Sequence, residues 1–406
     1  MIPRGAPNSH GPTPRLAGRL VPLRPSGLPG SLATVLEDGG IPLVGDDGWS
    51  AEQWARIRRL CANAVAQPGI GWASLTSGSG GFPRVVLRSA DSWSASFPAV
   101  EELLGAREGD VVALPAPPAS SLTLFSIAHS LEGGPRPAFP SGRTAATNDF
   151  ASATLFHGTP HALRQLLDTK TPPRLRAALV GGSGLDAGLR ARAEALGIRV
   201  VAYYGAAELS FVAVDHGEGY VPFPGVELDV RDGILWVRSP FVAAGHLEVS
   251  GPAGRAQDRP SAQDGAPRGP LRSANGWHTV DDRAELSTRG LRLLGRADGA
   301  VLTASATVVP EDVEAVLRSV DGVGDAVVLG LPHAALGDLL AAVIEPRQTG
   351  TPATAESMRR AARELLSPAH RPRRWFRARL PRTASGKPAR AEVARMLAAG
   401  EVDTLA

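Results

Sequence analysis

Residues 175–205, LRAALVGGSGLDAGLRARAEALGIRVVAYYG, decide the fold class. The segment opens with an apolar run that ends in two glycines, and it closes with a second apolar run that ends in two tyrosines and a glycine. Between these runs, DAGLRARAEALG (186–197) reads as a helix. Two apolar strands joined by a helix at this spacing are typical of parallel strand pairing. We therefore expect an α/β protein built on a mostly parallel sheet.

The segments before this stretch continue the alternation. Residues 51–67 and 89–105 read as helices, and residues 72–77 and 110–116 read as strands. Together they predict a large N-terminal domain, residues 31–297, of mixed and mostly parallel sheets. Residues 1–30 are rich in proline, glycine and arginine, a composition that predicts a poorly ordered N-terminus.

The pattern changes after Tyr220. GVELDVRDGILWVRSP (225–240) and LRLLGR (291–296) read as short strands with turn signals, which predicts a small β-rich subdomain. Residues 250–270 have low complexity and predict a flexible surface loop. Residues 298–406 read as a separate, smaller α/β domain that ends in a helix. Its other expected helices and strands are residues 308–320, 324–332, 339–346, 354–366 and 373–380.

Composition excludes several classes of protein. The chain has 406 residues with 43 basic and 40 acidic side chains, a net charge of +3, so no strong field favours nucleic acid or a membrane surface. Its single cysteine, Cys61, excludes an internal disulfide and a cysteine-based zinc site. The first residues lack the apolar core of a signal peptide, and prolines interrupt the longest uncharged run, residues 111–131. We expect a soluble, cytoplasmic protein.

Lysine usage draws attention to the C-terminus. Only two of the 43 basic residues are lysine, and one of them, Lys387, follows a Ser-Gly turn in LPRTASGKPAR (380–390). The other, Lys170, lies in a polar turn. A compact ammonium on a flexible stem offers chemistry that a planar guanidinium does not imitate. Lys387 is therefore either a catalytic cation or a solvated charge on a loop.

Two further segments are suited to phosphate chemistry. TSGSGGFPR (76–84) follows a strand, and its hydroxyls and glycines could present backbone N–H groups to a phosphate while Arg84 adds charge. A flexible turn is the alternative. YYGAAELS (203–210) places Glu208 at the carboxyl end of a parallel strand, where such sheets bind ligands. There Glu208 could hold Mg²⁺, unless it is an ordinary surface glutamate.

Acidic and basic side chains near the β-rich segment are candidates for nucleotide contacts. In GWHTVDDRAEL (276–286), Asp281 could accept bonds from two sugar hydroxyls. In LRLLGRADG (291–299), Arg296 ends a strand and could contact ribose or phosphate. Read separately, both residues are typical of solvated turns.

In this order, these segments resemble the core motifs of the adenylate-forming superfamily, which comprises acyl-CoA synthetases, the adenylation domains of nonribosomal peptide synthesis and firefly luciferase. TSGSGGFPRVV resembles its phosphate loop, VGGSGL (180–185) its adenine-side glycine turn, and YYGAAE its Tyr-Gly-x-Thr-Glu segment. GWHTVDD resembles Trp-x-x-Thr-Gly-Asp, LRLLGRADG the Gly-Arg-x-Asp hinge, and LPRTASGKPAR the closing Leu-Pro-x-Thr-x-Ser-Gly-Lys-x-x-Arg. The resemblance runs from Thr76 to the C-terminus.

The resemblance implies a ligase that uses ATP and Mg²⁺ to activate a small carboxylic acid as an acyl-adenylate and passes the acyl group to coenzyme A. It implies that Lys387, Glu208 and Thr76 are catalytic and that Glu208 holds Mg²⁺. Asp281 would bind the ribose, and Tyr204 would stack on adenine. The implied nucleotide-binding residues are Ser77, Gly78, Ser79, Gly81, Arg84, Gly182, Ser183, Tyr204, Gly205, Asp281 and Arg296. By position relative to these motifs, the acid pocket is Phe125, His129, His157, Ser210 and Phe211.

The resemblance also assigns roles to the two domains. Residues 31–297 would bind nucleotide and substrate. Residues 298–406 would form a mobile domain that carries the catalytic lysine and turns about Asp298. The chain is shorter on its N-terminal side than typical members, a shortness shared by the o-succinylbenzoate–CoA ligases of some actinobacteria.

Departures from the family pattern leave the acceptor open. Arg84 stands where lysine is usual, Ala207 where threonine is usual and Val280 where glycine is usual. Ala304 and Ser305 replace glycines at positions where backbone passes close to the acceptor, so their side chains could hinder a pantetheine arm. Three readings follow: transfer to coenzyme A; transfer to an amine or a carrier-protein thiol, including activation of nitrite to diazotise an aryl amine; and an inactive nucleotide-binding scaffold.

Overall fold

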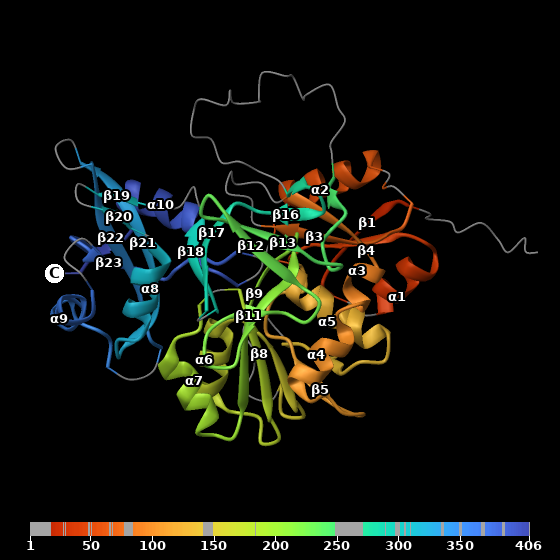
Figure 1. Cartoon of the computed structure of the whole chain (residues 1–406), viewed down its shortest axis with the longest axis horizontal. Helices are drawn as coiled ribbons and strands as arrows, with labels where there is room; N and C mark the ends of the chain where they lie inside the picture. Colours follow the sequence, from red (N-terminus) through yellow and green to blue (C-terminus); the bar gives the residue numbers. More distant parts are fainter. Residues whose placement is uncertain are drawn as a thin grey trace, which may run out of the picture.

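The computed structural model has a large N-terminal part and a smaller C-terminal part (Figure 1). The C-terminal part, drawn in blue, lies beside the β-rich strands β17 (Asp282–Ser287) and β18 (Gly290–Arg296). The structure describes residues 18–26, 28, 30–47, 49, 51–64, 66, 68–76, 84–140, 149–182, 184–247, 271–288, 290–296, 301–303, 306–308, 310–333, 337–348, 351–366, 370–383 and 386–405.

A seven-stranded sheet forms the centre of the N-terminal part, in the order β11-β10-β9-β8-β7-β5-β6. Strands β5 to β9 run parallel, whereas β10 and β11 are antiparallel to their neighbours. The predicted α/β fold with a mostly parallel sheet is confirmed. The strands are β5 Val111–Ala113, β6 Arg136–Ala138, β7 Leu155–Gly158, β8 Ala177–Gly181, β9 Arg199–Ala206, β10 Ser210–Asp215 and β11 Val221–Pro222.

Helices bury both faces of this sheet, which explains why its strands are continuous apolar runs. Within β8, Leu179 belongs to the core under α4 and α5, whereas Val180 belongs to the core under α6 and α7. Successive residues of a strand point to opposite faces, so one short sequence contributes to two cores. The flanking helices are α3 Asp91–Ser94, α4 Phe97–Leu104, α5 Ser121–Leu131, α6 Pro160–Thr169 and α7 Ala187–Glu194.

The helix predicted over residues 89–105 is two helices. α3 ends at Ser94 and α4 begins at Phe97, with Pro98 in its first turn. Proline lacks the N–H that a continuous helix would need, but it fits the first turn of a new one. The hydroxyl of Ser96 donates to the carbonyl of Trp93 at 2.7 Å and closes the break.

A second, five-stranded sheet includes a strand from the segment that was predicted to be poorly ordered. Its order is β1-β2-β3-β4-β14, and β1 pairs with β2 in parallel. The prediction that residues 1–30 are poorly ordered is wrong for residues 20–23, because Leu20 is buried in this core; residues 1–17 lie outside the described part. The elements are β1 Leu20–Leu23, α1 Gly30–Glu37, β2 Ile41–Val44, α2 Ala51–Asn63, β3 Ile70–Thr76, β4 Arg84–Ser89 and β14 Gly245–His246.

The predicted β-rich subdomain is a third, antiparallel sheet in the order β15-β16-β13-β17-β18, with β12 paired to β13. Strands β12 and β13 form a hairpin through Asp232 and Gly233, which both have positive φ angles. Asp-Gly is a favoured pair for such a two-residue turn. The predicted loop 250–270 lies outside the described residues. The remaining strands are β12 Glu227–Arg231, β13 Ile234–Arg238, β15 Arg272–Ala274 and β16 Trp277–Thr279.

The C-terminal part has a core of its own, in which Leu317, Ile344, Met358 and Trp375 are buried. The predicted boundary at residues 297 and 298 lies outside the described residues. No helix in the part of the chain that the structure describes is long and apolar enough to cross a bilayer. The elements are β19 Val301–Thr303, β20 Ala306–Val308, α8 Pro310–Arg318, β21 Val323–His333, β22 Gly337–Pro346, α9 Ala355–Leu365, β23 Arg374–Arg377, α10 Arg390–Ala398 and β24 Asp403–Thr404.

Candidate active site

A cavity of about 1100 Å³ lies at the carboxyl ends of the parallel strands. Thr159, Gly182 and Glu208 line it, and each follows closely after one of the strands β7, β8 and β9. This edge is where open α/β sheets bind ligands. Lys387 and Asp325 of the C-terminal part line the same cavity, so its wall combines the two parts of the molecule.

Lys387 reaches the cavity from the segment between β23 and α10. A Cβ atom added to Gly182 would lie 3.2 Å from the Cε of Lys387. Gly182 also has a φ of +93°, which a residue with a side chain rarely adopts. The glycine predicted for nucleotide binding therefore leaves room for the lysine predicted for catalysis.

Glu208 lies in the tight turn between β9 and β10. Its carboxylate is buried and lies 3.2 Å from the Nε2 of His246. Below the turn, the buried guanidinium of Arg88 donates to the carbonyls of Ala207 and Phe241. Burial lowers the pKa of Arg88 to about 9, although the charge of Glu208 opposes that shift. His246 and Arg88 thus fix Glu208 at the cavity wall.

The strand before this turn depends on a glycine. A Cβ atom on Gly205 would lie 2.2 Å from the carbonyl oxygen of Ser210, so no side chain fits there. Ser210 itself has a φ of 61° and, like Gly205, lines the cavity. The close approach of β9 and β10 at this point brings both residues to the wall.

The acid that faces the cavity beside Tyr204 is Asp282, not Asp281. The hydroxyl of Tyr204 donates to the Oδ2 of Asp282 at 2.5 Å, and both residues line the cavity. Asp281 has a φ of 63°, and its carboxylate accepts a bond from Arg272 at the edge of the β-rich subdomain. The sequence assigned the ribose to Asp281, whereas Asp282 is the acid of this turn that lines the cavity, so the turn directs the two neighbouring carboxylates differently.

Aromatic side chains form another part of the cavity wall. Phe125, His157, Tyr203 and Phe211 all line the cavity and contact one another, with the rings of Phe125 and Phe211 5.0 Å apart. The Nδ1 of His157 lies 2.8 Å from the hydroxyl of Ser126, and its Nε2 lies 3.1 Å from the hydroxyl of Tyr203. The structure thus brings three of the predicted pocket residues, Phe125, His157 and Phe211, together.

The fourth predicted aromatic residue, His129, lies behind this wall. It is one helical turn beyond Phe125 on α5, stacks on Phe97 at 4.4 Å, and bonds through Nε2 to Glu101 at 2.9 Å. It does not line the cavity. The sequence assigned His129 to the pocket, whereas its position one turn further along the helix places it in the packed core.

His157 predicts a measurable pH dependence of stability. Burial, followed by the neighbouring His129, lowers the pKa of His157 from 6.5 to about 3. The unfolded chain therefore binds a proton that the folded chain excludes, so stability falls as the pH drops below 6.5. The expected loss is about 2 kcal/mol by pH 5. Urea unfolding of wild type and His157→Gln at pH 7 and pH 5 measures it. Between pH 7 and pH 5, the free energy of unfolding of the variant should fall by about 2 kcal/mol less than that of wild type. Equal decreases in the two proteins would contradict the lowered pKa of His157.

Several predicted residues cannot be located. Ser77, Gly78, Ser79, Gly81, Ser183 and Asp298 lie outside the described residues, as do Ala304 and Ser305. For Thr76, Arg84 and Arg296 the structure describes only the backbone, at the ends of β3, β4 and β18. Their roles stay predictions.

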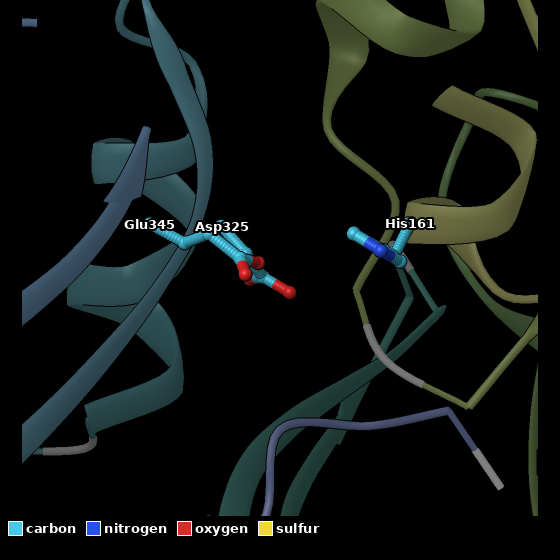
Figure 2. A group of neighbouring side chains, drawn as sticks. All are labelled: His161, Asp325 and Glu345. Carbon is cyan, nitrogen blue, oxygen red and sulfur yellow. The ribbon is translucent and has the colours of Figure 1, made fainter. Parts of the chain in front are cut away.

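A group of potential metal ligands lies beside the cavity. Donor atoms of His161, Asp325 and Glu345 lie within 4.8 Å of one another, with the imidazole on α6 and the carboxylates on β21 and β22 (Figure 2). The guanidinium of Arg382 already donates to both carboxylates. Burial and then Arg382 lower the pKa of His161 to about 4. Because the guanidinium of Arg382 already pairs with both carboxylates, we interpret the group as an ion-pair site.

Sequence reasoning missed five residues at the site. Thr159 and Tyr203 line the cavity next to predicted residues, and Asp282 adjoins Asp281. His246 and Arg88 support Glu208 from strands distant in sequence. Two of the five carried a sequence signal, Tyr203 as the first residue of the quoted YYGAAELS segment and Asp282 as the second acid of the Val-Asp-Asp turn.

Comparison with known proteins agrees with this geometry. Residues 72–253 match the AMP-binding enzyme family, and residues 312–387 match the AMP-binding enzyme C-terminal domain. A probable 2-succinylbenzoate–CoA ligase of Mycobacterium tuberculosis is 30% identical over 346 residues, 81% of this chain and 84% of that protein. A Bacillus subtilis protein named "uncharacterized acyl–CoA ligase YhfT" is 25% identical over 363 residues, 80% of this chain and 68% of that protein.

The fold agrees as well. The structure of an E. coli MenE variant with bound OSB-AMS superimposes with a TM-score of 0.74 at 20% identity, covering 90% of this chain and 85% of that one. The matched regions contain Glu208 and Lys387, which meet at the cavity. The chain belongs to the AMP-binding enzyme family of adenylate-forming enzymes, and it is an AMP-forming ligase.

Proposed function

We propose that this enzyme activates a small carboxylic acid with ATP as an acyl-adenylate and then transfers the acyl group to coenzyme A. One observation carries the proposal: Lys387 of the C-terminal part lines the same cavity as Glu208 and Asp282 of the N-terminal part. A cation and two acids around one cavity suit a nucleotide and an attacking carboxylate. The names of the two relatives, both CoA ligases, support coenzyme A as the acceptor.

In the first step, an oxygen of the carboxylate attacks the α-phosphorus of ATP and pyrophosphate leaves. The substrate brings its own nucleophile, so the protein has to position the two substrates and offset the growing negative charge. We assign this role to Lys387, whose compact ammonium can approach both the carboxylate and the α-phosphate. Asp282, held by Tyr204, is our candidate for the ribose hydroxyls. In the second step, the thiolate attacks the acyl carbon and AMP leaves.

Glu208 is a suitable ligand for Mg²⁺. Its carboxylate lines the cavity, and one of its oxygens lies 3.2 Å from the Nε2 of His246. Mg²⁺ in nucleotide sites is usually held by one or two carboxylates and by the phosphates. When bound, the ion would neutralise phosphate charge. Glu208 would hold it, and Arg88 would keep the Glu208 turn in place.

The aromatic wall is the proposed site for the body of the acid. Phe125 and Phe211 offer flat apolar surfaces, and the paired His157 and Tyr203 offer polar edges. A screen of carboxylic acids, with nitrite included, read by pyrophosphate release from ATP and Mg²⁺, tests the proposed function. Release that depends on one class of acid supports it. Tight ATP binding without release across the screen would favour the scaffold reading instead.

The acceptor is a separate prediction. With the correct acid and equal concentrations of coenzyme A and an amine, we expect an acyl-CoA product, because the two relatives reported above carry the names of CoA ligases. Side chains at Ala304 and Ser305 would act against this result by narrowing the path of the pantetheine arm. Mass spectrometry of the reaction mixture measures the outcome. An amide or a diazo product would overturn transfer to coenzyme A and establish an amine acceptor.

A further inference from the structure

Lys387 lies on one arm of a hairpin whose described arms are residues 381–383 and 386–389. Residues 382 and 388 form an isolated antiparallel bridge, and the N–H of Ala389 donates to the carbonyl of Pro381 at 2.7 Å. The carbonyl of Lys387 accepts from the N–H of Thr383 at 2.8 Å. These bonds fix the backbone of the hairpin internally, but they do not fix it to the rest of the C-terminal part. Two arginines, one on each side of the hairpin, do.

Arg382 holds the first side. Its guanidinium donates to the Oδ2 of Asp325 on β21 at 2.5 Å and to the carboxylate of Glu345 on β22. Glu345 also accepts the N–H of Leu380 at 3.1 Å. Asp325 is buried; burial raises its pKa, but Arg382 and then Arg318 outweigh that effect, so its pKa is lowered. Asp325 is therefore a charged, fixed anchor.

Arg390 holds the second side, where α10 begins. Its guanidinium donates to the carbonyl of Val328 on β21 at 2.6 Å, and it contacts Glu314 and Glu311 of α8 at 2.7 and 3.2 Å. Glu314 is buried and also accepts the N–H of Val328 at 2.8 Å. The carboxylate that receives Arg390 is thus itself fixed to β21.

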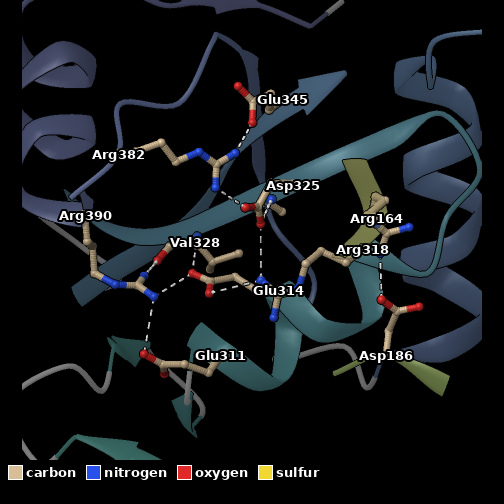
Figure 3. A network of polar contacts seen from close by, with 11 residues as sticks. Arg164, Asp186, Glu311, Glu314, Arg318, Asp325, Val328, Glu345, Arg382 and Arg390 are labelled. Carbon is tan, nitrogen blue, oxygen red and sulfur yellow. Dashed lines mark hydrogen bonds and ion pairs between the residues drawn. The ribbon is translucent and has the colours of Figure 1, made fainter. Parts of the chain in front are cut away.

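The two anchors belong to one network (Figure 3). Arg318 lies between them, 3.5 Å from Asp325 and 3.8 Å from Glu314. All the anchoring groups belong to α8, β21 and β22, so the hairpin is tied to the body of the C-terminal part. Fork-like bonds from a guanidinium to two acceptors fix orientation better than a single point charge does.

We propose that Arg382 and Arg390 are positioning residues that clamp this hairpin to α8, β21 and β22 and thereby hold the ammonium of Lys387 at the cavity. Neither arginine has to touch a substrate for this role. The catalytic consequence rests on the proposed function, whereas the placement of Lys387 can be measured without the acid.

The chain has only two lysines, so amine labelling reports on Lys387 against an internal reference. The folded protein is treated with trace acetic anhydride, with and without ATP and Mg²⁺, and acetylation of Lys387 and Lys170 is quantified by mass spectrometry. In wild type, ATP at about ten times its Kd should slow acetylation of Lys387 by about tenfold and leave Lys170 unchanged. The ratio of the acetylation rates of Lys387 without and with ATP measures whether Lys387 is held against bound nucleotide, and the same ratio for Lys170 is the reference.

Arg382→Gln and Arg390→Gln should reduce this protection to about twofold or less, while the Kd for ATP, measured by calorimetry, changes little. Arg395→Gln is the matched control, because Arg395 lies on α10 and pairs only with the exposed Glu392 and Glu401 among the described contacts. It should retain full protection. If Arg390→Gln does not fold, Arg390→Lys keeps the charge but loses the fork and should show the same direction of change.

With the acid found in the screen, each clamp variant should lower kcat of adenylate formation by about 10–100-fold and leave KM for ATP nearly unchanged, as expected when a reacting group is misplaced by about 1 Å. Combined with Lys387→Ala, neither variant should slow the reaction further, because both changes act through one group. Full protection of Lys387 in both folded clamp variants, or additive losses in the double variants, would overturn the proposal. A wild type that does not bind ATP would instead reject the proposed function.

Discussion

Lys387→Ala is expected to slow adenylate formation by about 10²–10³-fold, the scale seen when one preorganised donor to a transition state is removed. Lys387 lies beside Gly182 at the cavity, so its ammonium can reach charge that develops between the carboxylate and the α-phosphate. Affinity for ATP should change far less, because the interaction strengthens mainly in the transition state. Single-turnover measurement of acyl-AMP, together with calorimetric titration of ATP, separates the two effects.

Two controls make this prediction specific. Lys170→Ala removes the other lysine, which lies at the end of α6 away from the cavity lining, and should leave the rate unchanged. Lys387→Arg should not restore activity, because a guanidinium is wider and does not act as a compact point charge. A rate near that of wild type in Lys387→Arg would contradict the role assigned to this lysine.

Asp282→Asn is expected to raise KM for ATP by about 10–100-fold. If its carboxylate accepts bonds from ribose hydroxyls, the substitution weakens charge-assisted hydrogen bonds worth about 1.5–3 kcal/mol each. Asp281→Asn is the matched change one residue away. Because Asp281 pairs with Arg272 outside the cavity lining, the KM of this variant for ATP should stay within about twofold of wild type. Steady-state kinetics on both variants measures the difference, and a larger effect at Asp281 would restore the assignment made from sequence.

The pair Asp281 and Asp282 also illustrates the limit of the sequence. The motif spacing favoured Asp281, but Asp281 precedes strand β17, which begins at Asp282, and the positive φ of Asp281 turns its carboxylate toward Arg272. No propensity rule distinguishes two identical neighbours at the start of a strand. The hydrogen bond from Tyr204, which comes from another sheet, identifies the residue that faces the cavity.

Elements with strong periodic patterns were predictable. The strands around residues 177–181 and 199–206 and the separate C-terminal part followed from apolar runs and their spacing. Strand β1 was missed because its four residues lie within a segment rich in proline, glycine and arginine. It forms because β2, which it pairs with, and the core behind it are supplied by later parts of the chain.

Long-range support could not be predicted for the same reason. Arg88 and His246 contact the Glu208 turn from β4 and β14, and only the folded chain brings these three segments together. The contacts that clamp the hairpin of Lys387 could not be predicted from the sequence either. Arg382 and Arg390 lie in the quoted motif, but their partners on α8, β21 and β22 are all upstream, and nothing in the motif itself indicates them.

The transfer of an oxygen atom tests the central claim most directly. The acid found in the screen is prepared with ¹⁸O in its carboxylate and incubated with ATP, Mg²⁺ and coenzyme A. Attack of the carboxylate on the α-phosphorus, followed by cleavage at the acyl carbon, leaves one oxygen of the acid on the nucleotide. We predict AMP that carries one ¹⁸O, detected by mass spectrometry, together with pyrophosphate. Unlabelled AMP, or ADP with inorganic phosphate, would show that no acyl-adenylate forms and would contradict the account.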